Sequence, residues 1–203
     1  MRRKRLVVVA AATSALVLAG GMAATTAGAQ VTPKLPGATL PEAAQRAAPG
    51  PPATVLRTAA RRIVTHSDIS NNPMAPMQQR VLDLINLNRR RAGCGALSLD
   101  RRLIAVANLH AADMARRHYF AHNSPRGDSP GDRVRKAGYH WRQYGENIAR
   151  GFSSAYDVVN GWMHSAPHRA NILDCRLHQM GIGLAIGRGR TAYWVQDFAT
   201  PMT

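Results

Sequence analysis

Three ionisable side chains in the second half of the chain could do chemistry together, although they are far apart in sequence. They are His122, Glu146 and His168. Imidazoles take up and release protons near neutral pH and bind transition metals, and a carboxylate can orient an imidazole or bind a cation itself. Successive members of the set are 24 and 22 residues apart, unlike any local metal-ligand motif. Spacing alone therefore does not establish that the three side chains meet.

Each of these side chains lies in a short segment rich in turn-forming residues. The segments read Ala-His-Asn-Ser-Pro at 121–125, Tyr-Gly-Glu-Asn-Ile-Ala at 144–149 and Ser-Ala-Pro-His-Arg-Ala-Asn-Ile-Leu at 165–173. Together they resemble the signature of the CAP superfamily, the cysteine-rich secretory, antigen 5 and pathogenesis-related proteins, in its compact bacterial form. The resemblance implies an α-β-α sandwich. It also implies that His122, Glu146 and His168 lie in one cleft, as the first histidine, first acid and second histidine of the family's tetrad.

The tetrad of the larger family members has a fourth, acidic residue three positions after the tryptophan of the fourth helix. In this chain that tryptophan is Trp162, and the fourth position is occupied by Ser165. The tetrad is therefore incomplete. Asp157 or Asp174 could supply an acid from elsewhere, although nothing in the sequence indicates that either does. The metal binding and proteolysis that the resemblance implies would therefore have to occur here without the fourth residue of the tetrad.

The candidate site is compatible with three functions. In the first, His122, Glu146 and His168 bind one divalent ion, for which zinc is the natural choice, or the cleft binds a lipid, a sterol or a wall component, as the resemblance implies. In the second, the protein is a hydrolase in which Glu146 orients a histidine that acts on water or on the hydroxyl of Ser124 or Ser165. In the third, the three residues form a buried polar network in a structural wall protein. Because the chain has no His-Glu-x-x-His helix, we expect binding rather than catalysis, and no required cofactor.

Several other polar and aromatic residues are expected to lie near this site or in the core. His110 is on the apolar stripe of a predicted helix and is expected to be buried and hydrogen-bonded. His118 is expected to cap that helix or to lie at the surface, and His164 is a candidate for lining the cleft. Trp194 is expected in the core, and Gln196 is expected to reach toward the site.

The first 76 residues differ in character from the rest. Residues 1–29 have a basic start, an apolar stretch and a small-x-small end, which is typical of a cleaved signal peptide. Residues 30–76 are rich in proline and alanine and are predicted to be a disordered linker. Residues 77–201 form the predicted CAP-like domain. We therefore expect an exported protein, extracellular and associated with the cell wall, without a transmembrane segment once the signal has been removed.

The chain is strongly basic. Its formal net charge is +16, and residues 30–203 keep +12 because four of the 27 basic residues and none of the 11 acidic ones precede them. Such a surface favours anionic partners, such as wall polymers or lipid headgroups. The chain has no recognisable nucleic-acid-binding module and few aromatic residues to stack on bases, so we expect no specific nucleic-acid partner. We expect a monomer.

The two cysteines, Cys94 and Cys175, are predicted to form a disulfide. An even pair in an exported chain favours this, and neither cysteine has a CxxC partner or an adjacent histidine that would make it reactive. The bond would close a loop of roughly 80 residues, which the chain-entropy model rates at about 4 kcal/mol.

Helices precede a final hairpin, which indicates an α+β fold with helices packed around a small antiparallel sheet. The capping residues Asp100, Ser129 and Ser154 each begin a predicted helix. The predicted helices are one from Met77 that ends before Gly93, one with a buried stripe over 103–114, a short one ending near Gly138 and one with a stripe from Val158 to Ala166. The predicted strands are 180–186 and 192–198, joined by a turn at 187–190, with a further strand at 144–149.

Overall fold

The computed structural model describes residues 54, 58 and 60–202. The predicted signal peptide and residues 30–53 of the predicted linker lie outside the described residues. Within the described part, no helix is long and apolar enough to cross a membrane.

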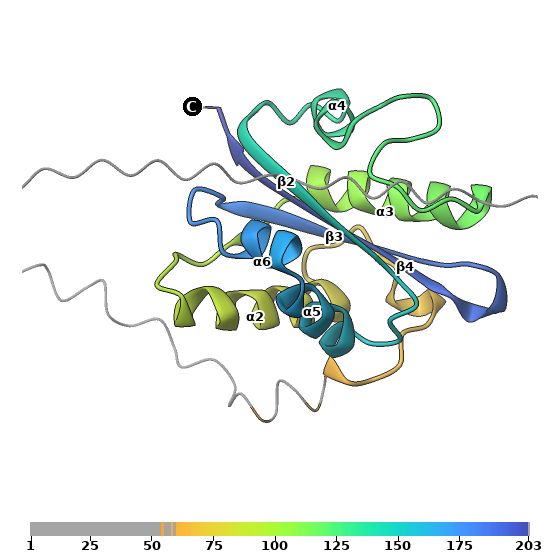
Figure 1. Ribbon diagram of the computed structural model, residues 1–203, viewed down its shortest axis with the longest axis horizontal. Coiled ribbons are helices and arrows are strands. Elements are labelled where there is room, and N and C mark those ends of the chain that lie inside the picture. Colours follow the sequence, from red (N-terminus) through yellow and green to blue (C-terminus); the bar gives the residue numbers. More distant parts are fainter. Residues whose placement is uncertain (1–53, 55–57, 59, 203) are drawn as a thin grey trace, which may run out of the picture. The chain divides into compact units, whose positions relative to one another are not determined.

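A four-stranded sheet lies at the centre of the domain (Figure 1). Its strands are β1 (Ser98–Leu99), β2 (Trp141–Arg150), β3 (Gln179–Ile186) and β4 (Ala192–Pro201), in the order β1-β3-β4-β2. The three strands expected from the sequence are antiparallel neighbours. The sequence did not predict β1, which runs parallel to β3 and makes the sheet mixed. Strand β2 forms one edge of this sheet.

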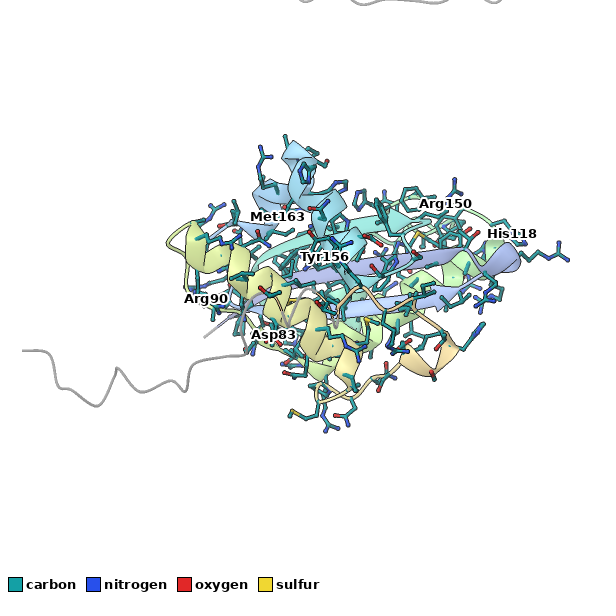
Figure 2. All side chains as sticks on the ribbon, turned by 90° about the horizontal axis from the view of Figure 1, so that it is seen from below. Asp83, Arg90, His118, Arg150, Tyr156 and Met163 are labelled. Carbon is teal, nitrogen blue, oxygen red and sulfur yellow. A yellow bond between two sulfur atoms is a disulfide. The ribbon has the colours of Figure 1, made fainter. Side chains whose placement is uncertain are left out.

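Helices cover both faces of the sheet, which confirms the α+β sandwich. They are α2 (Pro76–Arg91), α3 (Arg101–Arg117), α4 (Pro130–Lys136), α5 (Ala155–His164) and α6 (Ala166–Ile172), with 3-10 turns η2 (His66–Asp68) and η3 (Arg188–Arg190). Helices α3 and α4 lie over one face, and α2, α5 and α6 over the other (Figure 1). Figure 2 labels Asp83 and Arg90 on α2, and Tyr156 and Met163 on α5, which packs beside it.

The predicted caps begin three of these helices. The Asp100 carboxylate accepts hydrogen bonds from the backbone of the first turn of α3, and the hydroxyls of Ser129 and Ser154 do the same for α4 and α5. Helix α3 lies directly on the centre of the sheet because β3 carries Gly181 and Gly183 beneath it. A Cβ atom at either glycine would overlap the backbone of α3.

The predicted fourth helix is interrupted at Ser165, which has extended backbone angles (φ −105°, ψ 119°). It ends α5 and begins α6. The break has a local cause, since Pro167 has no N–H to continue the hydrogen-bond ladder of α5. As a result, Ala166 does not extend the buried stripe of α5, and His168 lies on a helix of its own rather than in a turn after a helix.

The segment before α2 packs on the domain, so the predicted end of the linker at residue 76 is too late. Ala60 and Val64 are buried in the core beside α2 and α5. The backbone N–H of Val64 donates to the carbonyl of Ser153 at 2.8 Å, and Ile63 forms a β-bridge with Ser154. Two small apolar side chains among polar neighbours make too weak a periodic signal to predict this docking from the sequence.

The predicted disulfide between Cys94 and Cys175 is confirmed. It joins the turn after α2 to the loop between α6 and β3. The buried Arg89 holds the same region, because its guanidinium donates four hydrogen bonds of 2.9 Å to backbone carbonyls. These carbonyls belong to Gly95, Ile172, Asp174 and Leu177. Both links fix the end of α6, the helix that carries His168.

Candidate functional site

Glu146 is the buried centre of the candidate site. Its side chain is 1% exposed. Oε1 accepts a hydrogen bond of 2.7 Å from Nδ1 of His122, and Oε2 accepts one of 2.5 Å from Nη2 of Arg133. Because a carboxylate only accepts, the first bond places a proton on Nδ1 of His122 and leaves Nε2 on the other side of the ring. Glu146 therefore orients His122, and both of its oxygens are used.

Arg133, on α4, belongs to this site but was not predicted from the sequence. Its side chain is 12% exposed and forms the ion pair with Glu146. Its Nη1 also donates to the backbone carbonyls of His122, at 2.8 Å, and Asp128, at 3.2 Å. Arg133 thus neutralises the buried acid and holds the loop that carries His122. No feature of the α4 sequence separates it from the other basic residues of that helix.

His168 lies on α6, with its ring held by the helix's own first residues. Its Nδ1 is 2.8 Å from the hydroxyl of Ser165. The hydroxyl at the position of the missing tetrad acid therefore contacts the second histidine. Partial burial lowers the pKa of His168, and the nearby charge of His122 lowers it further.

Helix α6 is attached to the edge strand β2 by asparagine side chains. Nδ2 of Asn147 donates to the His168 carbonyl at 3.1 Å, and Asn171 donates to the Glu146 carbonyl at 3.1 Å and to Asn147 at 2.9 Å. Since side chains alternate along a strand, Glu146 points to the α3 face and Asn147 to the α6 face, which follows from the strand predicted at 144–149. Gln196 also lies on the α6 face, where it accepts from Asn147, and so does not contact the acid.

A second acid, Asp197, lies next to Glu146 and was missed in the sequence. It is directly opposite Glu146 across the β2–β4 pair and is 1% exposed. Neither of its oxygens accepts a hydrogen bond from the described residues. Burial raises the pKa of Asp197 well above its usual range, and the charge of Glu146 adds to this, with Arg133 opposing. The raised pKa favours the protonated, uncharged form of Asp197 in the folded protein.

The two acids considered from the sequence, Asp157 and Asp174, contact residues outside the candidate site. Asp157 accepts from the hydroxyl of Ser154 at 2.7 Å in the cap of α5. Asp174 pairs with Arg176 at 2.8 Å. The sequence signal that could have identified Asp197 is its setting, since a charged residue inside a strand that is otherwise buried needs a special reason.

The other three histidines considered from the sequence, His110, His118 and His164, lie outside the hydrogen-bond network of the candidate site. His110 is buried, and its Nε2 is 3.0 Å from the carbonyl of Ala121, which confirms the prediction and helps to fix the loop before His122. His118 ends α3 in a left-handed conformation at φ 58° and is exposed (Figure 2). His164 is exposed, and its Nδ1 is 2.7 Å from the carbonyl of Asn160 in its own helix. None of the three makes a hydrogen bond to a residue of the candidate site.

The geometry limits the chemistry that the site can do. Among residues 60–202, no three histidine, cysteine or acidic side chains are grouped closely enough to hold a metal ion without rearrangement. With Glu146 committed to His122 and Arg133, the available donors are the Nε2 atoms of His122 and His168. Gly127–Gly131 also matches Gly-x-Ser-x-Gly, but its serine caps α4 through Asp132 and does not follow a strand.

Comparisons with known proteins agree with this fold. The family model described as CAP, cysteine-rich secretory protein family, matches residues 82–198. The chain is 35% identical over 121 residues to YkwD and 31% identical over 121 residues to the membrane protein YlbC, both of Bacillus subtilis. These matches cover 60% of this chain but 46% and 34% of the two proteins, so the chain spans less than half the length of these relatives.

Solved structures show the same similarity. An extracellular protein with an SCP domain from Bacillus anthracis is 31% identical with a TM-score of 0.54, covering 60% of this chain and 39% of that one. An outer surface protein from Borrelia burgdorferi is 19% identical with a TM-score of 0.59, covering 64% of this chain and 96% of that one, and shares the fold. Because the family model matches more than half of the residues, the chain belongs to the CAP family, the cysteine-rich secretory proteins.

Proposed function

We propose that this CAP protein is exported and binds a divalent metal ion, zinc by preference, through Nε2 of His122 and Nε2 of His168. The observation that carries the proposal is the matched tethering of the two imidazoles. Nδ1 of His122 is bonded to Glu146 and Nδ1 of His168 to Ser165, at 2.7 and 2.8 Å. A neutral ring that donates from Nδ1 has its lone pair on Nε2, and metal-binding histidines commonly have such an oxygen partner.

In this proposal Glu146 is a positioning residue rather than a metal ligand. It fixes the ring of His122 and increases the basicity of its Nε2, while Arg133 holds the carboxylate in place. The lowered pKa of His168 keeps that ring in the neutral form that binds metal. With two protein ligands, the ion keeps positions for water or for an oxygen of a larger ligand.

Export is supported by the signal-like features of residues 1–29 and by the disulfide between Cys94 and Cys175. Disulfides persist in oxidising compartments outside the cytosol. Localisation can be checked by fractionating cells that express the chain and locating the protein in medium, wall or cytosol.

A serine hydrolase is less well supported by the contacts. Ser165 contacts Nδ1 of His168 from three residues earlier in the chain, and among residues 60–202 no carboxylate is hydrogen-bonded to this ring to support it as a base. The lipid, sterol and wall-component ligands are alternatives that the same cleft would have to accommodate beside the histidines.

Calorimetric titration with zinc chloride tests the metal proposal. We expect saturable binding by the protein and its loss in the pair His122→Ala/His168→Ala. The matched control is His140→Ala/His178→Ala, which removes two exposed histidines elsewhere and should bind zinc as the unchanged protein does. Equal zinc binding by all three proteins, or by none, would overturn the proposal. If none of the three proteins binds zinc, then His122, Glu146 and His168 have a structural role only.

A further inference from the structure

A second hollow lies beside the candidate site, between the second half of α3 and the loop of residues 124–128. Its volume is about 280 Å³. Most of its charged lining is basic. The charged side chains that line it are Arg116, Arg117, Arg126, Arg133, Asp113 and Asp128. We call it the arginine pocket.

The ion pairs of the arginine pocket leave positive charge uncompensated. Oδ1 of Asp113 is 2.7 Å from Nη2 of Arg116. Its Oδ2 lies farther from Arg117, at 3.7 Å from Nη1. Asp128 is paired at 2.6 Å with a lysine outside the pocket, Lys136.

The other two arginines of the pocket, Arg133 and Arg126, differ in whether they have an ion-pair partner. Arg133 is paired with Glu146, whereas Arg126 has no ion pair among residues 60–202. Arg126 therefore contributes a charge without a counter-ion of its own, and Arg116 and Arg117 share the single carboxylate of Asp113.

The arginine pocket shares two residues, Arg133 and His110, with the contacts that hold His122 in place. Arg133 lines it while bonding to Glu146 and to the carbonyl of His122. The Nε–H of Arg133 is buried and has no hydrogen-bond partner among the described residues. His110, which fixes the residue before His122, also lines the pocket, and burial lowers its pKa, so this ring adds no charge. A ligand in the pocket would therefore lie beside the residues that orient His122.

We propose that the arginine pocket binds an oxyanion, a phosphate or carboxylate group of an anionic ligand. A guanidinium presents paired N–H donors that match the oxygens of either group, and the lining includes such donors from two segments, Arg117 from α3 and Arg126 from the loop of residues 124–128. The exposed side chain of Leu109 gives the pocket an apolar wall for the carbon part of the ligand. This proposal does not depend on metal binding at His122 and His168.

The test is a titration of the ¹⁵N-labelled protein with inorganic phosphate, with diethyl phosphate and with acetate, followed by amide chemical shifts at constant ionic strength. We expect saturating shifts confined to residues 109–117 and 122–133, for at least one of the three probes. Which probe binds distinguishes a phosphomonoester, a phosphodiester and a carboxylate. Shifts that rise linearly without saturation for all three, or that spread over the whole surface, would overturn the proposal.

Variants separate a built pocket from general attraction to a basic protein. Arg117→Gln/Arg126→Gln should weaken binding by about fivefold or more, because it removes the unpaired charge of Arg126 and one of the two arginines that share Asp113. The control Arg101→Gln/Arg188→Gln removes two exposed arginines outside the pocket and should change binding by less than about twofold. If the double variant is misfolded, Arg126→Gln alone, in an exposed loop, serves in its place. Equal weakening by test and control variants refutes the pocket.

Discussion

Replacing Glu146 with glutamine tests whether the buried acid organises the site. The substitution keeps the size and shape of the side chain but removes its charge. One of its two oxygens becomes an NH₂ group, so either the bond from His122 or the bond from Arg133 becomes a contact between two donors. The other bond survives as a weaker, neutral one.

The expected cost follows from the exposure of the partners. His122 is 51% exposed, so its half of the network is solvated and contributes little. Arg133 and Glu146 are 12% and 1% exposed, and breaking a buried ion pair by removing one partner costs about 3–5 kcal/mol. Because glutamine retains one hydrogen bond, we expect the lower end, about 3 kcal/mol. For a domain of this size that lowers Tm by about 6–12 °C.

Urea unfolding at pH 7 measures this loss, with Asp128→Asn as the control. That variant breaks an exposed ion pair with Lys136 and should cost less than about 1 kcal/mol. A Glu146→Gln variant no less stable than the control would refute the argument that the Arg133–Glu146 pair is a buried charge network. If stability falls while zinc affinity is unchanged, Glu146 supports the fold but does not position His122 for a metal.

Two further expectations concern stability. Removing the disulfide with Cys94→Ser/Cys175→Ser should lower the free energy of unfolding by about 4 kcal/mol, since the bond closes a loop between residues 81 positions apart; a loss below about 1 kcal/mol in urea unfolding would contradict this. Asp197→Asn should gain stability relative to the unchanged protein as pH rises above about 4, the pKa of an aspartate in the unfolded chain. Folded Asp197 keeps its proton to higher pH than the unfolded chain does, so the unchanged protein loses stability over that range and the variant does not. A constant difference between the two proteins across that range would show that Asp197 titrates normally.

Local features of the fold were predictable because their causes lie within a few residues. Asp100, Ser129 and Ser154 cap helices through hydrogen bonds to residues two or three positions ahead, and such contacts depend on nothing else in the chain. The opposite directions of Glu146 and Asn147 followed from strand alternation in the same way. The break at Ser165 was equally local, and the helical spacing of the apolar residues concealed it.

The charged centre of the site was not predictable, because it depends on strand order and register. Glu146 and Asp197 are 51 residues apart, and they meet because β2 pairs with β4 in one particular register. A shift of one residue would turn Asp197 to the other face, toward the asparagine network of α6. Arg133 reaches Glu146 from a third element, α4. Neither contact leaves a periodic trace in the sequence.

The distribution of charge links the two proposed sites. Glu146 and Arg133 neutralise each other, and the raised pKa of Asp197 favours its uncharged form, so the buried centre adds little net charge near a ligand outside it. A divalent ion at the histidines would then add positive charge on the side of the site where the arginine pocket lies. Repulsion between the ion and these arginines weakens binding of the ion while the pocket is empty. An oxyanion in the pocket would offset that repulsion. If both proposals hold, the two ligands favour each other, and the natural ligand is one that carries its anionic group close to a metal-binding oxygen.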